Sequence, residues 1–368
     1  MNNLSNLAEL KKIQLALHEN LESLTSFKDC AIIDWPKHYN LGDHLIWLGN
    51  IFYLANTAHF RISYATSLDN FSEAELEKKA PQAPILLHGG GNFGDFWPRS
   101  QKFREKIISK YHDRPIVILP QSLYFKEQEN LEKTTAIFNQ HPNLTLFLRD
   151  DYSYEIAKQF FTNCRVAKAP DLAFELVDIP NRSLPIKRNN SILYLYRKDR
   201  ENNTDFSPTA LNISNLVVED WRSYDWMTVL PKEWVYIPGL VRLIRDGWQR
   251  GLSIPQEWLS RQKWELFHPS TKLFSSLDNS SIHRMSWSMM HTGIYQLSQY
   301  SLVITNRLHV HILCSLLDIP HIFLPGAYYK NEVFYKTWTY QLPLVRFVKN
   351  PAEIKPAIDE LRDYVANG

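Results

Sequence analysis

Short runs of β-branched and aromatic residues alternate with amphipathic stretches along most of this chain. In the first half the runs lie at 31–35, 61–64, 85–88, 116–119 and 144–147, interleaved with helical patterns at 43–55, 99–111, 126–139 and 151–161. The alternation returns later, with runs at 191–196, 216–218, 302–304 and 321–324. Because parallel strands need a long crossover, usually a helix, this pattern predicts an α/β fold with mostly parallel sheets.

A polar, proline-bearing segment at 180–190 separates the two halves of this alternation. The chain has 368 residues, more than the roughly 100–200 of one typical domain, so we expect two domains. We place an N-terminal Rossmann-like domain at 1–182, a C-terminal one at 183–350 and a closing helix at 351–368. The two halves are expected to face each other across a cleft. The stretch 201–279, rich in tryptophan and polar loops, predicts little.

Charge and cysteine content exclude several classes of protein. Lysine and arginine number 41 against 39 acidic residues, and the net charge of +2 argues against a nucleic-acid partner. The three widely spaced cysteines fit neither a disulfide framework nor a zinc site, and suit a reducing cytosol. The N-terminus lacks a secretory pattern, and every apolar run is shorter than the about 18 residues of a membrane span. We expect a cytoplasmic protein without a transmembrane segment.

A glycine-rich segment follows the predicted strand at 85–88. It runs His88-Gly89-Gly90-Gly91-Asn92-Phe93-Gly94-Asp95 and matches the pattern G-x-G-x-x-G. In that pattern backbone N–H groups approach an anionic ligand at a helix start, although a tight turn also requires glycine. The next strand ends in Pro120-Gln121-Ser122, without the acidic residue that a dinucleotide site needs. We interpret the segment as a ligand loop that holds neither nicotinamide nor flavin.

The segment Asn40-Leu41-Gly42-Asp43 lies between the first predicted strand and a helix. Asp43 either caps that helix or contacts a ligand, since ligands of open α/β sheets bind beyond the carboxyl ends of the strands.

In the second half, Thr305-Asn306-Arg307-Leu308-His309 opens a helix. A guanidinium, a helix dipole and a titratable imidazole converge there, which predicts a site that binds phosphate and carboxylate groups. The alternative is that both side chains are merely solvated at a helix start. Arg197 holds the equivalent place after the strand at 191–196, with a surface arginine as the alternative. His309 and His311 lie about 200° apart on a helix, which prevents them from sharing a metal and predicts a structural role for His311. Zinc-protease, serine-hydrolase and P-loop signatures do not occur in the sequence.

Several of these segments, taken in order, resemble the polysaccharide pyruvyl transferase family. They are 40–43, 88–95, 119–122, 148–150, 169–174 and 305–309, followed by a lysine-bearing segment at 328–339. The resemblance implies two Rossmann-like domains similar to those of GT-B glycosyltransferases. It also implies the transfer of pyruvate from phosphoenolpyruvate to two hydroxyls of a sugar as a cyclic ketal. The sugar would belong to a precursor of an exopolysaccharide or cell-envelope polysaccharide.

The resemblance also assigns residues to the donor. In the family, arginines and an Arg-Leu-His segment hold phosphoenolpyruvate, and they match Arg197, Arg307, Leu308 and His309. Lys330 falls in the lysine-bearing segment, although Pro325-Gly326-Ala327-Tyr328 replaces a longer acidic and asparagine-bearing stretch of many members. On the acceptor side of the cleft we place the polar and glycine residues of the first half: Asn40, Gly42, His88, Gly89, Gly90, Gly91 and Asn92.

The chemistry of phosphoenolpyruvate suggests catalytic roles. C3 must be protonated before C2 is open to a hydroxyl, and we hypothesise that His309 supplies this proton while arginines neutralise the donor. Asp43, or else Asp95, would accept the hydroxyl protons. Because the reaction involves no redox step, we expect neither a cofactor nor a required metal.

Two other functions are open at this point. A glycosyltransferase would need a carboxylate for a nucleotide ribose, and Glu332 is the only acid shortly after the strand at 321–324. A non-catalytic carbohydrate-binding component of a polysaccharide assembly complex would use the aromatic residues, which form 13% of the chain, although such residues also build cores. The sequence does not distinguish a lipid-linked acceptor, which would bring the protein to the cytosolic face of the membrane, from a free one.

Overall fold

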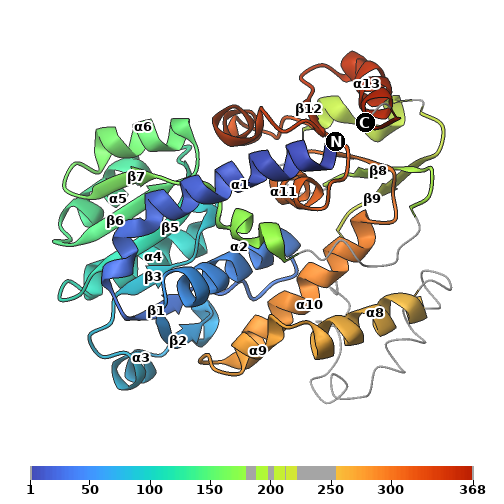
Figure 1. Ribbon diagram of the computed structural model, residues 1–368. Coiled ribbons are helices and arrows are strands. Elements are labelled where there is room, and N and C mark those ends of the chain that lie inside the picture. The colour runs from blue at the N-terminus through green and yellow to red at the C-terminus, as the bar shows by residue number, and fades with distance from the viewer. Residues whose placement is uncertain (1, 180–187, 198–202, 212, 222–253, 367–368) are drawn as a thin grey trace.

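Two parallel β-sheets organise the protein (Figure 1). The computed structural model describes residues 2–179, 188–197, 203–211, 213–221 and 254–366, so most of the expected linker at 180–190 lies outside the described residues. The first sheet has seven strands in the order β2-β1-β3-β5-β6-β7, with β4 paired to β5. The second has five in the order β12-β11-β10-β8-β9, and every pairing in both sheets is parallel. The predicted α/β class is confirmed.

The strands follow the predicted runs closely. The first sheet contains β1 (Asp29–Ile33), β2 (Arg61–Thr66), β3 (Ile85–Leu87), β4 (Gly90–Gly94), β5 (Ile116–Tyr124), β6 (Leu144–Leu148) and β7 (Arg165–Lys168). The second contains β8 (Ile192–Leu195), β9 (Leu216–Glu219), β10 (Leu302–Thr305), β11 (His321–Phe323) and β12 (Val345–Phe347). Each predicted run overlaps one of these strands, whereas the sequence patterns do not predict β4, β7 or β12.

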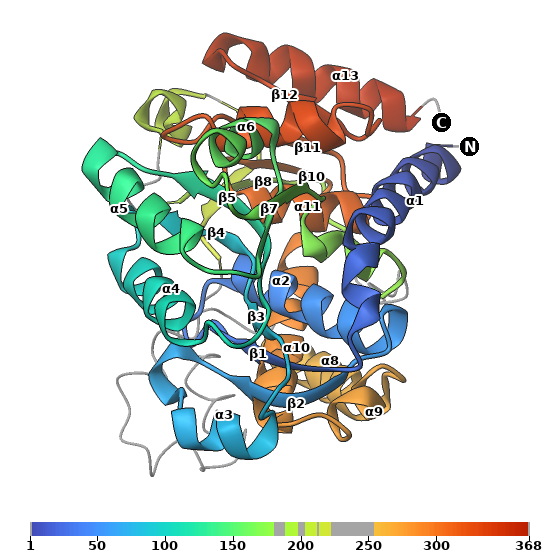
Figure 2. The ribbon, with the colours of Figure 1, turned by 90° about the vertical axis from the view of Figure 1, so that its left-hand side faces the viewer.

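Helices connect the strands and cover the sheets. They are α1 (Asn2–Leu21), α2 (Leu41–Phe52), α3 (Glu73–Lys79), α4 (Pro98–Lys110), α5 (Gln128–Asn139), α6 (Asp151–Phe160), α8 (Ile254–Phe267), α9 (Thr271–Phe274), α10 (Ser280–Leu297), α11 (Leu308–Leu316), α12 (Lys330–Phe334) and α13 (Ile354–Ala366). The closing helix is present as α13, and the two chain ends lie near it on the same side of the molecule (Figures 1 and 2). Within the described part of the chain, no helix has the length and apolar character required to cross a membrane.

Successive strand residues face different cores, because side chains alternate across a sheet. One face of the first sheet packs on α4 and α5, and one face of the second packs on α13. The other face of each sheet joins a single central core, to which α1, α2, α10 and α11 also contribute. This central core connects the two halves of the chain.

The contact between α2 and α10 is the clearest link between the halves. Trp47 on α2 is fully buried and its indole donates to Nδ1 of His283 on α10 at 3.1 Å. Trp35, just after β1, donates to Oγ of Ser286 on the same helix at 2.9 Å. These tryptophans pack in the protein core, which agrees with the burial preference of large aromatic residues.

The glycine-rich segment differs from the predicted ligand loop. Residues Gly90–Gly94 form strand β4, which pairs with the extended end of β5, and so do not wrap an anion at a helix start. Gly94 has a φ of 127°, and a Cβ there would collide with the carbonyl oxygen of Tyr124. Glycine at this position therefore serves the close approach of two strands. Gly91 and Asn92 nevertheless reach the cavity described below.

Candidate active site

A cavity of about 850 Å³ lies at the carboxyl ends of strands from both sheets. Its size falls within the roughly 300–1,000 Å³ of small-molecule sites. The first half contributes residues 34–40, 67–69 and 97–100 with Asp43, His88, Gly91, Asn92 and Arg149. The second half contributes Arg197, Asp220, Trp221, Arg307, Leu308, His309 and Lys330.

Positive charge predominates around the cavity. Its cationic side chains are Lys37, Arg99, Arg149, Arg197, Arg307 and Lys330, and its carboxylates are Asp34, Asp43, Asp69 and Asp220. Two of the carboxylates pair with lining cations, Asp69 with Arg99 and Asp220 with Arg307. Asp69 also lies 3.8 Å from Lys37, and Arg149 pairs with Asp171 outside the lining. The six cations still outnumber the four carboxylates of the lining, which favours an anionic ligand.

Ten of the residues predicted for the site line this cavity: Asn40, Asp43, His88, Gly91, Asn92, Arg197, Arg307, Leu308, His309 and Lys330. Gly42, Gly89 and Gly90 lie behind its wall, where an added Cβ would contact His309, the carbonyl of Pro120 and Ile46 respectively. Their role is to allow close packing beside the cavity.

Asp95 is placed differently. Its carboxylate accepts hydrogen bonds from the backbone amides of Lys126 and Glu127 at 2.9 Å, and from the side chain of Asn130 at 3.2 Å. These groups belong to the N-terminal end of α5, and Asp95 is absent from the lining of the cavity. The arrangement is that of a helix cap.

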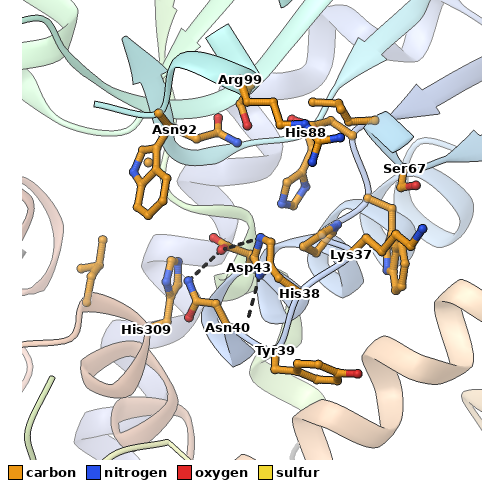
Figure 3. A pocket seen from close by; sticks show the side chains of 18 of the residues that line it. Lys37, His38, Tyr39, Asn40, Asp43, Ser67, His88, Asn92, Arg99 and His309 are labelled. Atoms are coloured by element: carbon orange, nitrogen blue, oxygen red, sulfur yellow. Dashed lines mark hydrogen bonds and ion pairs between the residues drawn. The ribbon is translucent and has the colours of Figure 1, made fainter. Parts of the chain in front are cut away.

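Asp43 belongs to the first turn of α2 and points into the site (Figure 3). Asn40 is the N-cap residue of this helix, so Asp43 is not required for capping. Asn40 donates to Oδ2 of Asp43 at 2.7 Å, and Nε2 of His38 lies 3.6 Å from the same oxygen. Burial alone would raise the pKa of Asp43, but His38, His309 and other nearby imidazoles hold it below its usual value. Asp43 is therefore an ionised carboxylate at neutral pH.

His88 presents a neutral imidazole to the same region, and its ring points toward His38 and Asp43 (Figure 3). Burial lowers its pKa to about 3. Its Nδ1 accepts a hydrogen bond from Nδ2 of Asn50 at 2.9 Å, which places the ring proton on Nε2. Nε2 is buried and has no hydrogen-bond partner among the described residues.

His309 lies between elements of both halves. It occupies the first turn of α11, and its Nε2 lies 3.4 Å from Oδ2 of Asp171. On its other side the ring packs against Gly42, where an added Cβ would lie 2.4 Å from Nδ1. The side chain is 12% exposed and lines the cavity, so both neighbours restrict its orientation.

Asp171 is fully buried and linked to a buried network. It pairs with Arg149, whose Nη1 lies 2.5 Å from Oδ2, while Nε of Arg149 donates to Ser122 at 2.9 Å. Ser122 in turn donates to Asp150 at 2.7 Å. Burial would raise the pKa of Asp171, but Arg149 and the hydrogen bond with His309 hold it far below its usual range. The carboxylate is ionised and can only accept, so Nε2 of His309 carries a proton.

The remaining cations lie on the side of the cavity that the second half of the chain forms. Arg307 precedes α11, and its Nη2 lies 2.7 Å from Asp220, which follows β9. Arg197 follows β8 and is 9% exposed. Lys330, at the start of α12, is 8% exposed and reaches toward Gly91 of β4, where an added Cβ would lie 3.6 Å from Nζ. Strand ends of both sheets thus bring these groups together.

The sequence patterns missed several residues of the site: Asp34, Lys37, His38, Arg99, Arg149, Asp171 and Asp220. Asp171 and Arg149 fall in two of the segments noted above. The sequence therefore drew attention to these segments but predicted no role for either residue. Among the described residues, no three histidine, cysteine, aspartate or glutamate side chains form a metal-binding cluster.

Comparison with known families decides how the chain is classified. Residues 40–327, most of the chain, match the model of a family described as polysaccharide pyruvyl transferase. The chain belongs to this family. The matched range includes the site residues from Asn40 to His309 and ends just before Lys330. The resemblance seen in the short segments is confirmed.

Relatives support the assignment over nearly the full length. EpsO of Bacillus subtilis (strain 168), named as a pyruvyl transferase, is 31% identical over 348 residues, covering 93% of this chain and 97% of that protein. Pyruvyl transferase 1 of Schizosaccharomyces pombe (strain 972 / ATCC 24843) is 28% identical, covering 84% of this chain and 70% of that protein. The family is one of pyruvyl transferases, which supports an enzymatic role for this chain.

The fold also occurs in a solved structure. This structure is that of an uncharacterized protein of Klebsiella pneumoniae subsp. pneumoniae NTUH-K2044, with a TM-score of 0.55 and 20% sequence identity. The match covers 92% of this chain and 98% of that one. At this identity the likeness concerns the α/β fold alone.

Proposed function

We propose that this enzyme transfers the pyruvyl group of phosphoenolpyruvate to two hydroxyls of one sugar residue, forming a cyclic ketal and releasing phosphate. The observation that supports this reaction most strongly is the composition of the cavity. Arg197, Arg307 and Lys330 approach from one half with His309 beside them, and Asp43 approaches from the other. Cations for an anionic donor, an acid and a carboxylate base are thus gathered around one space.

The donor carries a phosphate and a carboxylate, which require separate cationic partners. In our proposal Arg307, at the N-terminus of α11, binds the phosphate together with the helix dipole. Arg197 and Lys330 then face the carboxylate. His88 offers its Nε2 proton to a donor or acceptor oxygen, because this group lacks a partner in the described residues.

His309 is the proposed acid. Its proton adds to C3 of phosphoenolpyruvate, which makes C2 electrophilic toward the first sugar hydroxyl. Asp171 supports this role, since the contact of its ionised carboxylate with Nε2 orients the imidazole ring. Phosphate then leaves C2 and the second hydroxyl closes the ring. Asp43, ionised at neutral pH, accepts a hydroxyl proton.

Several further features belong to the same proposal. The two sheets on either side of the cavity are consistent with two Rossmann-like domains similar to GT-B enzymes, bounded as 1–182 and 183–350. We propose a cytoplasmic enzyme that uses neither cofactor nor metal. Its acceptor is a sugar of an exopolysaccharide or cell-envelope polysaccharide precursor, either free or lipid-linked.

Calorimetric titration with phosphoenolpyruvate tests the donor assignment. We expect saturable binding that Arg307→Ala weakens by roughly tenfold or more, the effect of losing one charged hydrogen bond. The variant should fold, because its partner Asp220 is 33% exposed and can be solvated. Arg346→Ala, which removes an arginine that pairs with Glu360 away from the cavity, is the matched control and should bind normally. Binding of a nucleotide sugar without phosphoenolpyruvate would contradict the proposal and favour a glycosyltransferase.

A further inference from the structure

Asp34 has an unusual backbone conformation at the wall of the cavity. It directly follows β1, and its φ is 74°, in the left-handed region that side chains with a Cβ rarely adopt. Among the described residues, four other non-glycine residues have positive φ, namely His59, Asn215, Asn279 and Asp318, and none of these lines the cavity. Such strain is concentrated at functional sites, because there the surrounding structure maintains it.

The surroundings of Asp34 hold its carboxyl group toward the cavity. Its side chain is hydrogen-bonded to Asn92 of β4. The amide oxygen of Asn92 already accepts from Nη2 of Arg104 at 2.6 Å and from Nε2 of Gln121 at 3.1 Å, so the amide nitrogen is the group that faces Asp34. Arg104 and Gln121 thus fix the amide of Asn92, which in turn holds the carboxyl group of Asp34.

Charged groups face Asp34 from two helices. Arg104 and Arg99 of α4 are positive, and Asp43 of α2 is negative. Burial outweighs the two arginines and raises the pKa of Asp34 to about 7. The pKa of Asp43 is instead lowered. Two nearby carboxyl groups whose pKa values are moved apart by their environments are typical of a catalytic pair.

Each of the two reacting sugar hydroxyls must lose its proton. Two new C–O bonds form between C2 and the sugar oxygens. The bond between C2 and the phosphate oxygen breaks, and C3 gains one proton. Two hydroxyl protons are released at different positions of the sugar. One restores the proton given by His309, and the other leaves with phosphate as hydrogen phosphate.

We propose that Asp34 is a second proton-transfer residue, which contacts one of the two acceptor hydroxyls and accepts its proton while Asp43 serves the other. This inference rests on the proposed function. It places the reacting sugar hydroxyls beside the carboxyl end of β1 and the start of α2. The cations that bind the donor lie opposite, on the second half of the chain.

Asp34→Asn tests the role, because asparagine tolerates left-handed φ and keeps the hydrogen bond to Asn92. Phosphate release from phosphoenolpyruvate is measured with a panel of methyl glycosides, and the best acceptor of the wild-type enzyme is used. We expect kcat to fall by about 100-fold or more while the Kd for phosphoenolpyruvate changes less than about twofold. The wild-type kcat should rise with pH around pH 7, as Asp34 ionises, and the variant should lose this rise.

Asp34→Gly separates proton transfer from a structural role. Glycine adopts a φ of 74° without strain and leaves space for a small carboxylate. Formate should raise the turnover of this variant by about tenfold, because it replaces the missing base. The control is Asp318→Gly, since Asp318 also has a positive φ, of 52°, but lies away from the cavity; it should match the turnover of the wild type. An Asp34→Asn enzyme that keeps more than a third of the wild-type kcat, or no rescue by formate, overturns the inference. Wild-type protein that releases no phosphate with any glycoside contradicts the proposed function itself.

Discussion

His309 shows how single residues of different elements build the candidate site. Its ring lies between Gly42 of α2 and Asp171, which precedes a short helical turn, and it belongs to α11. Neither neighbour is close to it in the sequence. The orientation of the His309 ring therefore depends on the absence of a Cβ at Gly42 on one side and on the buried carboxylate of Asp171 on the other.

Gly42→Ala should test this arrangement. The new Cβ would lie 2.4 Å from Nδ1 of His309, so the ring must move. We expect kcat to fall by about tenfold or more, since small displacements of catalytic groups are costly. Alanine is the better helix former by about 0.8–1.0 kcal/mol, which limits the loss of stability. Steady-state kinetics and urea unfolding measure the two effects.

Gly326→Ala is the matched control for that substitution. Its Cβ would meet Asn331 at 3.5 Å, an ordinary van der Waals contact, so this variant should keep wild-type turnover. If Gly42→Ala also turns over normally, the position of His309 is not set by this contact.

The residues that sequence patterns predicted are those that follow strands or open helices. Asn40, Asp43, Arg307 and His309 belong to this class, since the ends of parallel strands converge at one edge of a sheet. Asp171 and Arg149 could not be recognised in this way, because their roles depend on which groups they meet in three dimensions. Asp34 was assigned to a strand, and its φ is not encoded in any pattern.

At the scale of elements, α5 explains the position of Asp95. The carboxylate accepts from the backbone amides of Lys126 and of the N-cap residue Glu127, which lie just before this helix and have no intrahelical acceptor. Sequence reasoning ranked Asp95 after Asp43 as a candidate base, because both lie in the half of the chain opposite the expected donor site. Most of the glycine-rich segment is strand β4, and Asp95 after it contacts the start of α5 and does not line the cavity.

Asp95→Ala distinguishes a cap from a base. We expect the free energy of unfolding to fall by about 1 kcal/mol, the typical cost of losing an N-terminal cap, with kcat unchanged. Asp43→Asn should show the reverse pattern, a large loss of kcat at nearly constant stability. Chemical denaturation and phosphate release on the same preparations provide the comparison. A loss of turnover in Asp95→Ala without a loss of stability would restore Asp95 as a candidate base.

The sequence predicted helices and strands best where the local residue pattern and the packing in the folded protein favour the same structure. The β-branched and aromatic runs of the sequence each correspond to a strand of one of the two sheets. Strand β4 was missed because glycine is disfavoured in strands and resembles a loop. It forms because β5 continues to Tyr124 and supplies a pairing edge. Helix α10 was missed because polar residues and tryptophans obscure its period, whereas its packing on α2 stabilises it.

At the scale of the whole molecule, the central core and the cavity are both shared by the two halves. Helices α2 and α10 pack together in the core, and α2 and α11 both border the cavity. The geometry of the site therefore depends on the packing between the halves. Several of the side chains that hold this packing are histidines buried without charge.

Acid should destabilise the protein through these histidines. Burial lowers the pKa to about 4 for His44, His283 and His321, and to about 3 for His88 and His291. It also holds the pKa of His311 well below its usual value. In the unfolded chain they protonate near 6.5, so their stabilising contribution is complete above that pH and is lost as the pH falls toward 4. Asp34, with its raised pKa, opposes this as a single group.

We expect the free energy of unfolding to fall by about 3 kcal/mol or more per pH unit between pH 6 and 5, corresponding to at least two net protons. Urea unfolding at closely spaced pH values measures the slope. His321→Gln, at a buried histidine that contacts His311 at 2.8 Å, should reduce the slope, whereas His112→Gln, at an exposed one, should leave it unchanged. A free energy of unfolding that stays constant over this range would mean that the buried imidazoles are protonated in the folded state, and that the packing between the halves tolerates their charge.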